Sequence, residues 1–212
     1  MTHGRDQAFI SAAQTAMQLL AHPEVAARWE EPSRLPRMSV GMLACHLARQ
    51  VERSQEILPV QATDTPLPET VDHYRRAAWV TAEDLEDPAN DRTDDARGAS
   101  QGVEAMRTRC GDALIEVDRL LSDGGARDVV TIPWQGWSLR REDFLLTRMV
   151  EIVTHSDDLA RSLNLPTPTF SDEAYLPVVY LLARLAVERH GQAAITSALT
   201  RRERMPETIS AF

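Results

Sequence analysis

Apolar residues recur at three- and four-residue intervals along most of the chain, the spacing that is typical of amphipathic helices. The first such segment covers residues 6–28 and is interrupted at His22-Pro23. A second runs from Ser39, a suitable N-cap, to about Leu58, where Pro59 ends it. The pattern therefore predicts two helices in the first quarter of the chain.

Further helices are predicted over residues 69–85, 101–121, 141–163 and 171–204, the last with a break at Gly191. Between the first two of these, residues 83–95 are acidic and contain proline and asparagine. This stretch is predicted to be a solvated loop.

One short segment has a different pattern. Residues 129–132 read Val-Val-Thr-Ile, and Trp134-Gln135-Gly136-Trp137 follows as a turn. The chain of 212 residues is of single-domain length. We therefore predict an all-α protein in which residues 1–212 form one four-helix bundle. It should have long connections, a short β-hairpin near residues 129–139 and a C-terminal helical extension over residues 170–205.

Composition narrows the classes of function. The 32 acidic residues outnumber the 23 basic ones, so the formal net charge is -9, which argues against a nucleic-acid partner. The basic residues are all arginine, and this excludes a P-loop lysine or a lysine Schiff base. Neither a secretory signal nor a stretch long enough to span a membrane is recognisable, so no membrane partner and a cytoplasmic location are expected.

The helix over residues 141–163 carries a candidate metal site. Glu151 and His155 stand four residues apart, so their side chains lie one turn apart on the same face and can hold one cation. An exposed Glu–His pair is also common, and this helix alone does not decide between the two readings. His46, at the edge of the apolar stripe of another strong helix, is a candidate third ligand. Two histidines and one carboxylate would leave positions open for substrate, as in catalytic metal sites.

The residues around these candidates resemble a known family. Residues 38–49, Met-Ser-Val-Gly-Met-Leu-Ala-Cys-His-Leu-Ala-Arg, are similar to the helix that carries the first histidine in the DinB-like superfamily. Residues 144–161 contain the pattern Glu, three residues, His, two residues, Asp-Leu, which resembles the mycothiol-dependent maleylpyruvate isomerase branch. The resemblance covers most of residues 5–165. In the isomerase itself a further domain follows the bundle, whereas residues 166–212 of this chain are expected to form helix.

This resemblance implies a DinB-like four-helix bundle that binds a divalent metal, usually zinc, through His46, Glu151 and His155. It also implies a low-molecular-weight thiol as cosubstrate, mycothiol in actinobacteria or bacillithiol in other bacteria. The expected activity is transfer of the thiol to a small electrophile, or thiol-assisted cis–trans isomerisation of one. Arg148 and Asp158 are further candidates for catalytic residues. Arg148 would bind an anionic or polyhydroxyl substrate, and Asp158 would accept a ring N–H from a ligand histidine. Either could equally be an ordinary ion-pair partner.

Two other classes of function stay open at this stage. One is a non-catalytic, metal-free bundle with a binding or regulatory role. The other is an iron(II) enzyme, because two histidines and one carboxylate also suit that metal. In each case a monomer or homodimer with small-molecule partners is expected.

Overall fold

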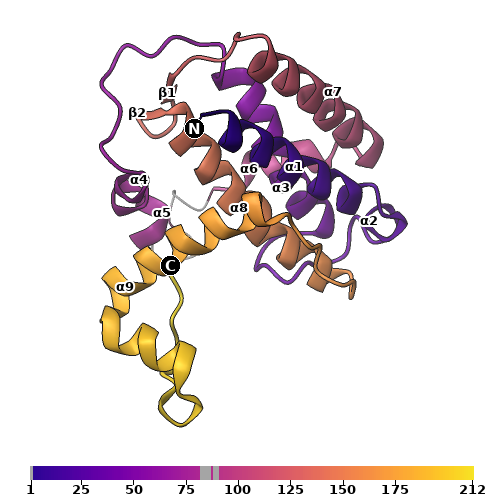
Figure 1. Cartoon of the computed structure of the whole chain (residues 1–212). Coiled ribbons are helices and arrows are strands. Elements are labelled where there is room, and N and C mark those ends of the chain that lie inside the picture. Colours follow the sequence, from indigo (N-terminus) through magenta and orange to yellow (C-terminus); the bar gives the residue numbers. More distant parts are fainter. Residues whose placement is uncertain (1, 82–86, 88–90) are drawn as a thin grey trace.

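The computed structural model describes residues 2–81, 87 and 91–212, which are mostly helical (Figure 1). The helices are α1 (Thr2–Leu20), α2 (Pro23–Ala27), α3 (Val40–Ile57), α4 (Thr70–Arg76), α5 (Ala78–Thr81), α6 (Thr93–Ala99), α7 (Val103–Ser122), α8 (Arg141–Ser162) and α9 (Asp172–Thr200), followed by the 3₁₀ turn η2 (Arg202–Arg204). The strands β1 (Val129–Ile132) and β2 (Trp137–Arg140) pair antiparallel. A mainly helical chain with a short hairpin near residues 129–139 is thereby confirmed.

Four long helices, α1, α3, α7 and α8, pack against one another and enclose the core. The largest side chains in this core that are almost fully buried include Phe9, Leu43, Leu47, Met106, Phe144, Leu145 and Met149. They recur at the three- and four-residue spacing seen in the sequence. Burial of each such side chain contributes about 1.5–3 kcal/mol to folding. This packing fixes α3 and α8 beside each other.

Helix α3 begins where the sequence predicts. The Ser39 hydroxyl oxygen accepts a hydrogen bond from the backbone N–H of Met42 at 3.1 Å and so caps the first turn. One side of α3 then faces the core and is formed by the buried residues Leu43, Leu47 and Val51. His46 lies at the edge of that side and keeps a partly exposed side chain.

The hairpin and the C-terminal helix also follow the sequence. Gly136 has φ of 78°, which the turn between β1 and β2 requires. The Trp137 indole N–H donates to His73 Nδ1 at 3.2 Å, which ties the hairpin to α4. Gly191 has φ of 81° and kinks α9 at the predicted break.

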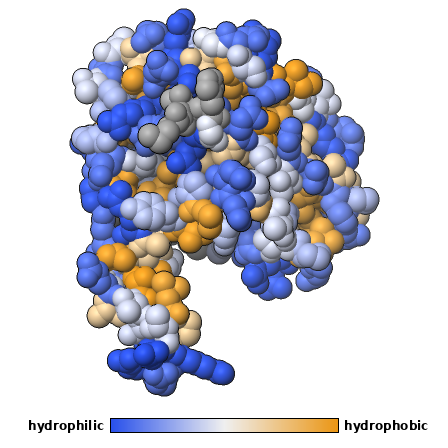
Figure 2. Space-filling model, in the orientation of Figure 1, coloured by the Kyte–Doolittle hydropathy of each residue, from blue (hydrophilic) through white to orange (hydrophobic). Residues whose placement is uncertain are grey.

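The second half of α9 forms an arm that leaves the bundle (Figure 1). Figure 2 shows apolar side chains along this arm, and Leu176, Val179 and Leu199 of α9 are exposed. The chain then returns, and the Phe212 ring packs on Tyr74, with their centroids 5.3 Å apart. Across the described part of the chain, every helix is too short or too polar to span a bilayer.

Two sequence expectations need correction. The helix expected over residues 69–85 is divided at Ala77 into α4 and α5, and residues 82–85 lie outside the described part. The solvated loop expected over residues 83–95 is also wrong at its end. Residues 93–95 form the first turn of helix α6, and Asp95 is only 3% exposed. Most of the remainder of that stretch lies outside the described residues.

Gly41 allows the indole of Trp29 to pack directly on α3, and its replacement tests this packing. A Cβ at Gly41 would lie 2.5–2.8 Å from the indole of Trp29, whose N–H donates to the carbonyl of Ala99 at 3.1 Å. Gly41→Ala is therefore expected to lower the free energy of unfolding by about 1–3 kcal/mol in urea titrations. Gly111→Ala on α7, where a Cβ meets nothing within 4 Å, is the matched control. Gly111→Ala should instead raise the free energy of unfolding by about 0.5–1 kcal/mol. Equal effects of the two substitutions would contradict the packing argument.

Candidate metal centre

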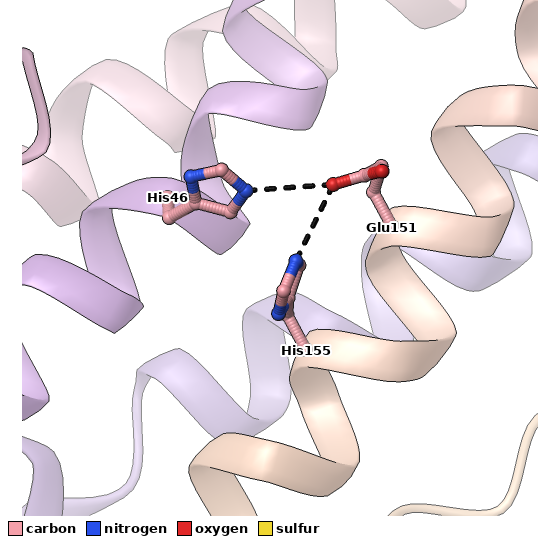
Figure 3. Close-up of side chains that lie close together, drawn as sticks. All are labelled: His46, Glu151 and His155. Atoms are coloured by element: carbon pink, nitrogen blue, oxygen red, sulfur yellow. Dashed lines mark hydrogen bonds and ion pairs between the residues drawn. The ribbon is translucent and has the colours of Figure 1, made fainter. Parts of the chain in front are cut away.

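Helices α3 and α8 bring together all three residues that the sequence singled out as metal ligands (Figure 3). His46 Nε2 lies 3.4 Å from Glu151 Oε2, and His155 Nε2 lies 3.3 Å from the same oxygen. One ligand atom from each residue falls within 4.8 Å of the others. The three side chains are 17–19% exposed, so each is partly accessible to solvent.

These distances fit a single zinc-type ion. Zinc binds imidazole nitrogen and carboxylate oxygen at about 2.0–2.2 Å, so two ligands of one tetrahedral ion lie about 3.3–3.6 Å apart. The two measured nitrogen-to-oxygen distances match that separation. Three protein ligands also leave at least one coordination position for a further ligand. The donor set and its spacing therefore suit a divalent cation with an open site.

Each candidate ligand histidine is oriented by a second carboxylate. His46 Nδ1 lies 3.1 Å from Asp95 Oδ2, and His155 Nδ1 lies 3.0 Å from Asp158 Oδ2. A carboxylate accepts hydrogen bonds, so each Nδ1 donates its proton to its aspartate and each Nε2 faces Glu151, where it would offer a lone pair to a bound metal. Asp158, expected from the sequence as a catalytic residue, thus contacts a candidate ligand.

Asp95 is the site residue that the sequence reading missed. It lies on α6 with a side chain only 4% exposed, and Arg49 Nη2 lies 3.3 Å from its Oδ1. Arg49 also lies 3.1 Å from Asp94, the exposed neighbour of Asp95. Asp95 therefore links α6, α3 and the first histidine. Its acidic context indicates a solvated loop, and the sequence carries little sign of its burial.

The electrostatics of the triad favour a charged glutamate beside a charged histidine when the protein is metal-free. Burial alone favours neutral Glu151, but hydrogen bonds with His155 and His46 hold its pKa well below the usual range. Burial likewise opposes a charge on His155. Hydrogen bonds with Asp158 and Glu151 outweigh this and raise the pKa of His155 to about 9. A cation at the three ligand atoms would take the place of that proton.

Zinc uptake by the metal-free protein is therefore expected to release about one proton between pH 7 and 8. Because the folded pKa of His155 lies above its ordinary value of 6.5, the stability it adds is full below pH 6.5 and lost as the pH rises through about 9. Calorimetry in buffers of different ionisation enthalpy measures the released protons. Uptake with no proton release at pH 7 would contradict this charge state.

Arg148, the other catalytic candidate from the sequence, lies one turn before Glu151 and is only 5% exposed. Its Nη1 donates to Gln50 Oε1 at 2.8 Å, and the Gln50 amide donates to the carbonyl of His46 at 2.8 Å. Gln50 thus connects Arg148 to the helix turn that carries His46. Arg148 donates no hydrogen bond to either histidine, and it acts on the triad through its positive charge, which lowers the pKa of Glu151.

The neighbouring cysteine does not join the centre. Cys45 is buried, and burial raises the pKa of its thiol to about 12, so it stays protonated at neutral pH. Searches with this chain matched no family model, no curated protein and no solved structure. The site is therefore interpreted from its own residues.

Proposed function

We propose that this chain is a divalent-metal enzyme that activates a low-molecular-weight thiol for reaction with a small electrophile. The metal, most simply zinc, would be held by His46, Glu151 and His155, and the fold would be a DinB-like four-helix bundle. The observation that carries the proposal is the convergence of these three ligand atoms from α3 and α8 within 4.8 Å. The resemblance to the mycothiol-dependent maleylpyruvate isomerase branch supplies the thiol as the expected cosubstrate.

The chemistry follows from the pKa of thiols. A free thiol, with a pKa near 8.5, is mostly protonated at neutral pH, and coordination to a divalent metal deprotonates it. The sulfur would form a bond to an electrophilic carbon of the substrate, and the thiol proton would pass to the substrate or to water. If the bond to sulfur persists, the product is a thiol conjugate. If it breaks again after rotation about a carbon–carbon bond, the result is cis–trans isomerisation.

The residues around the triad have distinct parts in this scheme. Asp158 and Asp95 hold the two imidazoles so that each Nε2 faces the ligand position. Glu151 contributes the one negative ligand, which keeps the centre able to attract an anionic thiolate. Arg148 places a fixed positive charge next to the reacting groups.

The test combines metal analysis with a thiol screen. The chain purified without chelator should contain about one zinc per protein, and mycothiol or bacillithiol should raise its melting temperature. A matched screen with the oxygen analogue of each thiol should have little effect, because the analogue lacks the sulfur. Purified protein that holds iron(II) would support the oxygen-chemistry alternative. Protein that binds no added metal would support the non-catalytic one.

A further inference from the structure

Arg148 is a buried cation that forms no ion pair with a carboxylate in the described part of the chain. Its hydrogen bonds go to Gln50 Oε1 at 2.8 Å and Thr147 Oγ1 at 3.3 Å, both neutral acceptors. Among the residues that the structure describes, none gives it an ion pair. By contrast, the partly buried Arg141 faces Asp6 at 3.4 Å. A charge removed from water without a counter-ion destabilises the fold, so its retention calls for a ligand of opposite charge.

A second unneutralised arginine lies close by. The Arg53 guanidinium stacks 4.1 Å from the ring centre of Trp134 on the hairpin turn and makes no ion pair within the described part of the chain. Burial, together with the positive charge of Arg148, lowers the pKa of Arg53 to about 10. Arg53 also lines a groove of about 270 Å³ that opens beside α3 and α6. The groove exposes Arg53 to solvent, whereas Arg148 lies deeper, behind Gln50.

The Tyr74 hydroxyl adds a hydrogen-bond donor in the same region. Tyr74 is 1% exposed, and its hydroxyl has no hydrogen-bond partner among the described residues. Burial and the nearby Glu151 carboxylate raise its pKa, so the phenol keeps its proton, and the charge of Arg148 also acts on it. A buried donor without an acceptor is costly, as is an unpaired charge. A bound anion that accepts a hydrogen bond from the Tyr74 hydroxyl and pairs with Arg148 would account for both features.

Glu151 does not fill that role. Its Oε2 is already shared by the two imidazoles, and it is the one carboxylate of the candidate ligand set. Glu151 and Asp95 act on Arg53 through their charge without contacting it. A divalent cation at the triad would more than cancel the charge of Glu151 and would leave Arg148 and Arg53 without a counter-ion in contact. The region is therefore complementary to an anion.

We propose that Arg148 and Arg53, together with the Tyr74 hydroxyl, bind an oxyanion group of the small-molecule substrate beside the metal centre. The planar forks of the two guanidinium groups suit a carboxylate or a phosphate. The inference rests on the proposed function in one respect, that the anion belongs to the electrophile on which the thiol acts. The anion site itself is built from residues outside the ligand triad.

The test measures anion binding by calorimetry and thermal unfolding on the full chain, zinc-loaded and chelator-treated. The probes are succinate, inorganic phosphate and the neutral succinamide. Succinate or phosphate should stabilise the protein, and succinamide should not. Arg148→Met should weaken anion binding about 10- to 100-fold, and Arg53→Met about 10-fold. Arg189→Met, at an exposed position on α9, is the control and should change nothing.

Unfolding without any anion gives a second readout. Arg148→Met should melt at the same temperature as the wild type or above it, because it removes an unpaired buried charge. A purely structural Arg148 would instead make this variant less stable, and that result overturns the proposal. Arg53 is partly exposed, so Arg53→Met keeps the test decisive if Arg148→Met does not fold.

The metal and anion results separate the two proposals. Zinc binding with no anion effect, or with an anion effect that neither variant changes, overturns the anion site and leaves the metal function standing. Anion binding that depends on both arginines in a chain that takes up no zinc supports the anion site and removes the metalloenzyme proposal. The relative response to succinate and phosphate distinguishes a carboxylate from a phosphate substrate.

Discussion

His155→Ala protein is expected to purify without stoichiometric metal and without thiol-dependent activity. The substitution removes one of the three ligands. The remaining two, His46 and Glu151, are fewer than the three protein ligands of a catalytic zinc site, so they should not retain the metal. Loss of a hydrogen-bond partner of a ligand already costs about 10- to 100-fold in metal affinity, so loss of the ligand itself should cost more. Metal content after dialysis and a competition titration with a chromophoric chelator measure the change.

His190→Ala is the matched control for this experiment. His190 lies on α9, and its Nε2 is 2.8 Å from the carbonyl oxygen of Ser210, away from the triad. Its loss should leave the metal content unchanged. Circular dichroism should show equal helix content in both variants. Full metal content and activity in folded His155→Ala would show that His155 is not a ligand.

The fold was largely predictable because its helices are amphipathic and well delimited. Ser39 and Pro59 bound α3 in the sequence, and Gly191 marks the kink in α9. Periodicity also indicates which face of each helix is apolar, and so places His46 at the edge of its stripe. Periodicity does not indicate which helices pack against each other. The approach of α3 to α8 depends on the packing of the whole core, and the sequence could suggest it only through a family resemblance.

Two features of the site, the burial of Asp95 and the contacts of Arg148, depend on packing that the sequence does not contain. Asp95 lies in an acidic segment whose composition indicates solvent exposure, and its burial depends on Arg49 and on the docking of α6 against α3. The sequence names Arg148 as a candidate for binding an anionic or polyhydroxyl substrate, or equally as an ion-pair partner. In the structure its partner is Gln50, from another helix, and no carboxylate of the described residues pairs with it. Both depend on contacts between segments far apart in the chain.

Asp95→Asn is expected to weaken zinc binding about 10- to 100-fold while leaving all three metal ligands in place. The Asp95 carboxylate accepts the Nδ1 proton of His46 at 3.1 Å and so keeps the Nε2 lone pair directed at the ligand position. An amide can present its N–H to Nδ1 instead, which favours the tautomer that carries the proton on Nε2. The metal must then compete with that proton. Zinc competition titrations across pH measure the loss.

Asp94→Asn is the neighbouring control for this effect. Asp94 shares Arg49 with Asp95, but its side chain is 54% exposed and makes no hydrogen bond to either candidate ligand. Its neutralisation removes one charge from the same turn of α6, so a purely electrostatic effect would appear in both variants. If orientation of His46 is the cause, only Asp95→Asn lowers affinity, and nitrogen-15 spectra of His46 shift toward the Nε2-protonated form. Equal loss in the two variants would assign the effect to net charge and remove Asp95 from the centre.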